Sequence, residues 1–160
     1  MYIHFRVSGT SWSRIILSLM LSPSIKDYKP DDLEDIVRIF NCARESASCY
    51  PEEQFDAEAM LALIEGEEVL VATLGKSAVG FASVWTSSSF LHHLYVSPDY
   101  QFQGVGSSLI EACKARFGLP LFLKCDQCNL KAQRYYRNRG WTRISEGAGD
   151  YGPWIELKLV

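Results

Sequence analysis

The sequence predicts an α/β protein in which a central, twisted, mixed β-sheet is flanked by about four helices. Two observations point to this class. Between residues 68 and 96, three short apolar segments are separated by turn residues, which is typical of an antiparallel meander. After residue 96 the chain alternates helix, strand, helix and strand, and such crossovers place helices on both faces of a sheet that includes parallel strands.

The first helices follow from the spacing of apolar side chains. Asp31 and Glu34 predict a capping box at the start of a helix, with Asp31 as the N-cap. Residues 33–40 place apolar side chains at positions i, i+3, i+4 and i+7, so this helix should lie on a core. A second, shorter helix is expected over residues 56–64, and Gly66 should end it.

The other elements alternate along the chain. We expect strands near residue 25 and at 68–74, 78–85 and 90–96, a helix from 105 to about 118, a strand at 121–125, a helix from about 129 to 138 and a final strand at 154–160. Residues 75–76 should turn the first hairpin. Gly140 and Trp141 should turn the chain back toward the last strand.

Length and composition indicate one globular domain. The chain has 160 residues, of which 48% are hydrophobic and 22% are charged. We expect the domain at residues 25–160 and an extension of unclear role at residues 1–24. The net charge of −3 argues against a general nucleic-acid binder, and the apolar run at residues 15–21 is too short to span a membrane.

Charge is divided unevenly along the chain. Residues 1–80 carry a net charge of −6, and residues 81–160 carry +3. A basic half suits a phosphate-rich ligand, whereas an acidic half suits a cationic one.

The cysteines do not predict a metal site. Cys125 and Cys128 form the only close pair among five, and the three histidines lack the spacing of zinc ligands. We therefore expect no metal, and reduced thiols in a cytoplasmic protein.

A glycine-containing turn after strand 90–96 is the most informative motif. Residues 94–110 read LYVSPDYQFQGVGSSLI, with the spacing Gln101-x-x-Gly104-x-Gly106. Glycines at a helix start let a ligand approach the backbone, and the unpaired N–H groups of the first turn bind anions such as phosphate. The spacing differs from the dinucleotide fingerprint G-x-G-x-x-G and from the nucleotide-triphosphate P-loop.

A second motif, NLKAQRYYRNRGW, follows at residues 129–141. In this order, the two motifs resemble the pyrophosphate loop and the N-x-x-A-x-x-[FY]-Y-x-x-x-G-[FW] pattern of the GNAT superfamily of N-acetyltransferases. The resemblance covers residues 25–160 and implies the GNAT acyl-CoA N-acyltransferase fold. It also implies that an acetyl group moves from acetyl-CoA directly to a primary amine, in a ternary complex and without an enzyme nucleophile.

The resemblance assigns the cosubstrate to the elements that carry these motifs. The residues expected to bind acetyl-CoA are Leu94, Tyr95 and Val96 along the pantetheine arm, Gln101, Phe102, Gln103, Gly104, Val105, Gly106, Ser107 and Ser108 at the pyrophosphate, and Asn129 from the next helix. Phe102 departs from the family, which has a small residue here. Its backbone must therefore take an ordinary φ, or its ring must point into solvent.

The resemblance also implies an acid and a base. Tyr136 matches the general-acid tyrosine, because a phenol is protonated at neutral pH and can donate to a thiolate. His92 is the expected base, because histidine titrates near neutral pH. Strand alternation should send His92 and His93 to opposite faces of the sheet. The alternative bases are His93, a water, Glu65, Glu67 and Glu68.

The sequence therefore predicts an acetyl-CoA-dependent N-acetyltransferase. The acidic N-terminal half favours a small cationic amine as the acceptor. Two alternatives stay open, namely acetylation of a protein N-terminus or lysine, and a non-catalytic module that only binds acyl-CoA. Neither nucleic acid nor a membrane is an expected partner, and a homodimer is left open.

Overall fold

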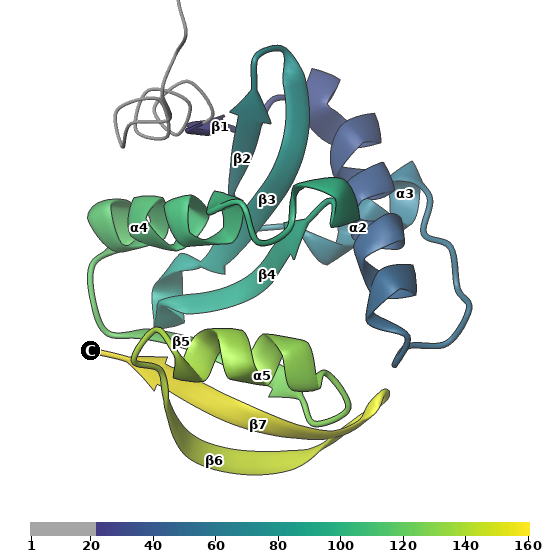
Figure 1. The fold of residues 1–160 in the computed structure, drawn as a ribbon. Coiled ribbons are helices and arrows are strands. Elements are labelled where there is room, and N and C mark those ends of the chain that lie inside the picture. Colours follow the sequence, from purple (N-terminus) through teal and green to yellow (C-terminus); the bar gives the residue numbers. More distant parts are fainter. Residues whose placement is uncertain (1–21) are drawn as a thin grey trace, which may run out of the picture.

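The computed structural model describes residues 22–160, which form a seven-stranded mixed sheet with four α-helices (Figure 1). The elements are β1 (Ser24–Asp27), α2 (Leu33–Ala47), α3 (Ala57–Leu63), β2 (Glu68–Leu74), β3 (Ser77–Trp85), β4 (Phe90–Val96), α4 (Val105–Phe117), β5 (Leu121–Asp126), α5 (Leu130–Arg137), β6 (Thr142–Gly149) and β7 (Gly152–Leu159). The predicted fold class is confirmed. Residues 1–21 of the expected extension lie outside the described residues.

The helices cover both faces of the sheet, and each face has its own core. Along β2, Leu70 and Ala72 contribute to the core beneath α4 and α5. Val69 and Val71 alternate with them and contribute to the core beneath α2 and α3. A strand buried on both faces is apolar at almost every position, which is why β2 is easy to find in the sequence.

The sheet opens in its middle, between β4 and β5. The strand order is β1-β2-β3-β4-β5-β7-β6, and β4 and β5 are the parallel neighbours. These two strands pair only at Phe90 and Phe122 and then diverge, as Figure 1 shows. The second half of β4 therefore has backbone groups on its β5 side that need another partner. One of them, the Val96 carbonyl, accepts a hydrogen bond of 3.1 Å from Nε2 of Gln101.

A β-bulge interrupts the pairing of β3 with β4. Ser83 lies opposite His93 and Val84 lies opposite Leu91, so that His92 is the additional residue in β4. A bulge bends its strand and changes the direction of the side chains around it. This local irregularity positions both histidines.

The start of α2 differs from the prediction. A short 3-10 turn over Pro30–Asp32 precedes the helix, and the capping box expected from Asp31 and Glu34 is wrong. The carboxylate of Asp32 instead accepts from the backbone N–H of Lys29 at 2.9 Å and from Nζ of Lys26 at 2.5 Å. Because of this turn, the residue whose carboxylate accepts hydrogen bonds at the helix start is Asp32 and not Asp31.

The expectation of reduced thiols is also wrong in part. Cys49, in the loop after α2, forms a disulfide with Cys128, in the loop before α5. Cys42, Cys113 and Cys125 remain free. The bond joins two loops at the end of the sheet where β5 stops. Among the helices of residues 22–160, none is long and apolar enough to cross a membrane.

Candidate active site

The turn before α4 presents a row of unpaired backbone donors. Gly104 has φ of 87° and Phe102 has φ of 63°, and these left-handed residues turn the chain sharply into the helix. Within residues 22–160, the N–H groups of residues 102–107 find no hydrogen-bond acceptor. With the positive end of the helix dipole, they form an anion site.

Phe102 fits this turn in one of the two ways expected. Its φ is positive rather than ordinary, and its side chain is 93% exposed. The ring therefore lies in solvent and leaves the backbone donors accessible. The left-handed conformation costs roughly 1 kcal/mol for a residue with a Cβ.

The first turn of α4 is closely packed against α5. A Cβ on Gly106 would lie 2.9 Å from the hydroxyl oxygen of Tyr135, which explains why glycine stands here. Nε of Arg139 donates to Oγ of Ser107 at 3.0 Å, and the Arg139 guanidinium lies 3.8 Å from the centre of the Tyr135 ring. Arg139 thus brings a positive charge to the donor-lined turn.

Asn129 begins α5, and its Oδ1 accepts from the N–H of Ala132 at 3.1 Å. This N-cap bond uses the side-chain carbonyl for the helix itself. The amide nitrogen of Asn129 has two donors, of which one forms a hydrogen bond with the Tyr50 hydroxyl and one is left for a ligand.

Tyr136 is held from two sides by aromatic rings. Its side chain is buried, with the Trp141 ring edge-on at 5.5 Å and the Tyr135 ring edge-on at 5.3 Å. Burial raises the pKa of Tyr136 well above its ordinary value. The phenol therefore keeps its proton over the whole neutral range.

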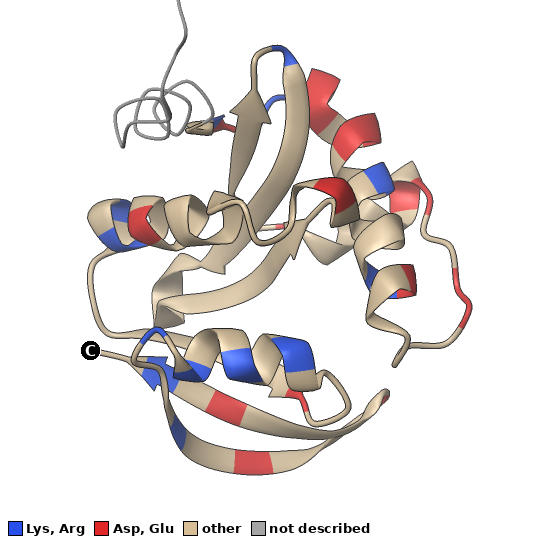
Figure 2. Cartoon of the chain, viewed as in Figure 1, with Lys and Arg blue, Asp and Glu red and all other residues tan. Residues whose placement is uncertain are grey.

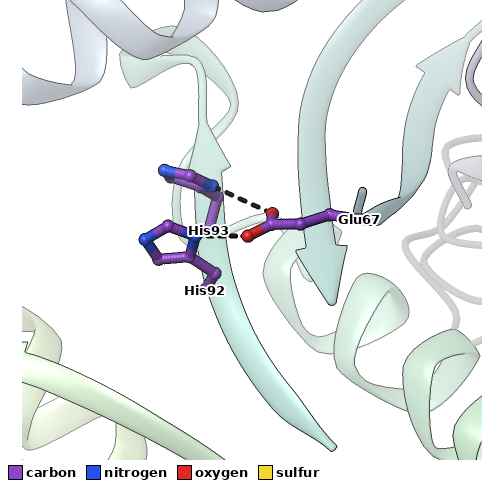
Figure 3. A group of neighbouring side chains, drawn as sticks. All are labelled: Glu67, His92 and His93. Atoms are coloured by element: carbon purple, nitrogen blue, oxygen red, sulfur yellow. Dashed lines mark hydrogen bonds and ion pairs between the residues drawn. The ribbon is translucent and has the colours of Figure 1, made fainter. Parts of the chain in front are cut away.

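His92, His93 and Glu67 form one compact group (Figure 3). Oε1 of Glu67 lies 2.5 Å from Nδ1 of His92, and its Oε2 accepts from the hydroxyl of Ser83. Because that hydroxyl gives its proton to Glu67, Ser83 must accept from Nδ1 of His93, at 2.8 Å. Both histidines then carry their proton on Nδ1 and present the lone pair of Nε2.

The expectation that His92 and His93 face opposite sides is wrong. Their ring centres are 4.0 Å apart, and both rings turn toward Glu67. The bulge at His92 breaks the alternation on which that expectation depended. Of the three glutamates considered, the structure brings Glu67 into the group, whereas Glu68 pairs with Arg116.

Burial and hydrogen bonding act on this group in opposite directions. Burial by itself raises the pKa of Glu67, but the hydrogen bonds from His92, His93 and Ser83 outweigh it and bring the pKa to about 2. The pKa of His93 is lowered, chiefly by burial, so that its ring is neutral at neutral pH. Glu67 is thus a fixed anion beside two possible proton acceptors.

Comparison with known proteins decides the family. The chain matches the family model described as acetyltransferase (GNAT) family over residues 33–141. This protein belongs to the GNAT acetyltransferase family. It is therefore an acyltransferase, and the family's reaction is acetyl-CoA-dependent acyl transfer. Among curated proteins, none matches this chain.

Solved structures agree with this assignment. A GCN5-related N-acetyltransferase from Rhodopseudomonas palustris is 28% identical, with a TM-score of 0.72 over 86% of this chain and 94% of that chain. Ard1 from Thermoplasma volcanium is 23% identical, with a TM-score of 0.68 over 87% of this chain and 97% of that chain. The protein yncA from Salmonella typhimurium, solved with its cofactor acetyl-CoA, is 20% identical, with a TM-score of 0.67 over 86% and 93%.

The residues of this GNAT acetyltransferase fit acetyl-CoA by two observations. Among the described residues, the backbone donors at residues 102–107 find no acceptors, and on its β5 side the second half of β4 finds no strand partner, apart from the Gln101 side chain at the Val96 carbonyl. An extended pantetheine chain and a pyrophosphate have the acceptors and donors that such groups need. Arg139 and Glu67 were absent from the residues assigned through the family motifs, because Arg139 occupies a variable position of the second motif and Glu67 lies in neither motif.

Proposed function

We propose that this protein is an N-acetyltransferase that moves an acetyl group from acetyl-CoA directly to a primary amine of a small molecule. One observation carries the proposal. A protonated, buried phenol on α5 lies in the same core as Leu91 of β4, and a histidine pair fixed by an anion lies on β4 itself, the strand that the sheet leaves half unpaired. An acyl transfer to an amine needs both a proton donor and a proton acceptor.

Acetyl-CoA supplies the acetyl group as a thioester. Its pyrophosphate would bind the N–H groups of residues 102–106, with Ser107, Ser108 and Arg139 beside them, whereas the Gln101 N–H already donates to the Pro98 carbonyl at 3.3 Å. The backbone of Leu94, Tyr95 and Val96 would hold the pantetheine arm as an added strand. Asn129 would contribute its amide nitrogen.

His92 is proposed as the base that takes the proton from the amine. Glu67 fixes its tautomer through Nδ1 and leaves Nε2 as the acceptor, and a carboxylate in this position also stabilises the protonated ring. The His92 side chain is 43% exposed, so it can pass its proton to water, whereas the His93 ring is buried. His93 is the second candidate.

Tyr136 is proposed as the acid. Its hydroxyl holds a proton that the departing sulfur needs, and its high pKa ensures that this proton is present at neutral pH. The rings of Trp141 and Tyr135 hold the phenol in place. No metal takes part in this scheme, although Glu67, His92 and His93 could together offer three ligand atoms.

The test is release of CoA from acetyl-CoA in the presence of a panel of amines, with the acetylated product identified by mass. His92→Ala and His93→Ala are compared across pH, and the rising limb of the profile should be lost in His92→Ala. Treatment with a chelator should leave the rate unchanged. Binding of acetyl-CoA without any transfer would instead favour a non-catalytic acyl-CoA-binding module, and transfer only to peptides would favour a protein acetyltransferase.

The setting of the reaction is part of the same proposal. We keep the cytoplasm as its location and a small-molecule amine as its partner, and the net charge of −3 supports no role for nucleic acid. Thiol counting in cell extracts prepared under alkylating conditions tests the location, because the Cys49–Cys128 bond would be reduced in most cytoplasms.

A further inference from the structure

Arg44 is a buried cation for which residues 22–160 provide no counter-ion. It lies near the end of α2, its side chain is only 5% exposed, and its Nε and Nη2 find no hydrogen-bond partner. Among the carboxylates of residues 22–160, none forms an ion pair with it. Burying a charge without a partner is costly, so a group of this kind calls for an explanation.

Aromatic rings surround the Arg44 guanidinium and offset only part of this cost. Its central carbon lies 4.4 to 5.3 Å from the ring centres of Phe40, Tyr50, Phe55 and Tyr151. The faces of such rings attract a cation. The rings do not accept hydrogen bonds from the N–H groups, which point outward in the plane of the guanidinium. The Tyr95 hydroxyl forms a hydrogen bond with the guanidinium, whereas the N–H bonds of Nε and Nη2 remain available to an anion.

The two unpartnered nitrogens have the arrangement that a carboxylate needs. Nε and Nη2 share one edge of the guanidinium plane, and their parallel N–H bonds can bind both oxygens of one carboxylate. Such a bidentate pair is the usual way in which arginine recognises a carboxylate. An apolar cage with an arginine edge at one side therefore selects a flat, singly charged anion.

Arg44 lies beside the proposed catalytic groups rather than at a separate site. Its charge acts on both Tyr95 and His93, although burial has the larger effect on the pKa of each. Tyr95 belongs to the half of β4 that would hold the pantetheine arm, and the Tyr95 and Tyr50 side chains also act on Tyr136. The ring centre of Phe40 lies 5.3 Å from the guanidinium carbon of Arg44, and 4.7 Å and 5.8 Å from the ring centres of Tyr95 and His93. A ligand held by Arg44 would thus lie close to β4 and the histidine pair.

We propose that Arg44 binds the carboxylate of the acceptor, and that the acceptor is an amino acid or a similar small amine bearing a carboxylate. This inference rests on the proposed acetyl transfer and names its substrate class. The Tyr50 and Tyr151 rings, edge-on at 5.8 Å, cover the guanidinium from two turns and limit the size of what reaches it. They must separate as the carboxylate binds.

The charge distribution is consistent with this substrate class. The acidic residues that favoured a cationic acceptor include a cluster on the first half of α2, as Figure 2 shows, whereas Arg44 is near the other end. The amine of an amino acid is still an ammonium ion in solution. The acceptor is thus a zwitterion, which carries a carboxylate as well as the cationic ammonium group.

The experiment measures binding first, because binding does not require the acceptor to react. Free L-amino acids and their carboxamides are titrated calorimetrically into the full chain, with and without CoA. We expect at least one acid to bind about tenfold more tightly than its amide, as loss of a bidentate charged pair implies. The same acid should be the better acceptor in the CoA-release assay, with the difference in KM rather than in kcat.

Arg44→Met and Arg38→Met form a matched pair of variants on α2, since Arg38 is exposed and pairs with Asp35 on the surface. Arg44→Met should remove the preference for the acid over the amide. Its melting temperature should be equal to or above that of the wild type, because an unpaired buried charge is replaced by an apolar side chain. Arg38→Met should keep the preference.

Several outcomes would overturn the inference. One is a wild-type protein that binds no acid better than its amide, a result that needs no variant to fold. Another is a preference that survives in Arg44→Met. A clear loss of stability in Arg44→Met without any acid preference in the wild type would make Arg44 a structural cation. Failure of the proposed function looks different, because then neither acetyl-CoA binding nor transfer to any amine is observed.

Discussion

Replacing Glu67 by glutamine tests whether one carboxylate holds the two histidines. The Glu67 side chain is 1% exposed, and its pKa is about 2 instead of the ordinary 4.5. A difference of about 2.5 pH units corresponds to at most about 3 kcal/mol of folding free energy. Because His92 is partly exposed to water, which weakens the interaction, we expect Glu67→Gln to cost about 1–2 kcal/mol at neutral pH.

The pKa shifts of Glu67 and His93 determine how the stability of the fold changes with pH. The folded pKa of Glu67 lies below the unfolded value, so its stabilisation is present above pH 4.5 and is lost as the pH falls toward 2. His93 acts in a higher range. Burial lowers its pKa below the ordinary 6.5, so the unfolded chain takes up a proton first and stability falls as the pH drops below that value.

Urea unfolding of the wild type and of Glu67→Gln, measured at about pH 7, 5.5, 4.5 and 3, separates the two ranges. The difference between the proteins should be full at neutral pH and should shrink below about pH 4.5. Glu68→Gln is the matched control, because Glu68 is exposed in its pair with Arg116 and should cost less than about 1 kcal/mol. A Glu67→Gln difference that stays constant with pH would show that the Glu67 carboxylate does not stabilise the fold through its charge.

Three further changes test other parts of the site. Tyr136→Phe should lower kcat by about 10²- to 10⁴-fold without changing the Kd for acetyl-CoA, since the ring stays and the proton is lost; an unchanged kcat would remove Tyr136 as the acid. Gly106→Ala should cost about 1–2 kcal/mol in urea unfolding and weaken acetyl-CoA binding, because the added Cβ would lie 2.9 Å from the Tyr135 hydroxyl. Adding Tyr135→Phe should recover most of that stability, and a double variant without recovery would contradict the contact. Reduction of Cys49–Cys128 should cost about 2–4 kcal/mol, because the bond closes a long loop; equal urea midpoints with and without reductant would argue against the disulfide.

The sequence predicted those elements whose packing leaves a regular pattern. The strands β2, β3 and β4 and the helices α4 and α5 carry apolar side chains at fixed periods, and they lie where expected. The strand β6 has no such pattern, because nearly all of its residues are exposed. It pairs with β7 through its backbone, and backbone pairing leaves no periodic trace in the side chains.

The site was predictable where a motif covers it and not elsewhere. Tyr136 and the turn at residues 101–106 follow from local spacing and the family resemblance. Glu67 meets His92 across 25 positions of sequence, and a β-bulge decides where that ring points. The cage around Arg44 is formed by aromatic rings from separate parts of the chain. Such groupings arise from the tertiary fold, for which one sequence carries no local signal.

The most direct test of the account is thermal melting of the purified, CoA-free protein with and without acetyl-CoA at up to about millimolar concentration. We expect a rise of several degrees in the melting temperature, because a ligand at 100 times its dissociation constant adds about 2.7 kcal/mol. The rise should shrink in Gly106→Ala, whose added Cβ disturbs the first turn of α4. A folded protein whose melting temperature does not respond to acetyl-CoA would contradict the central claim.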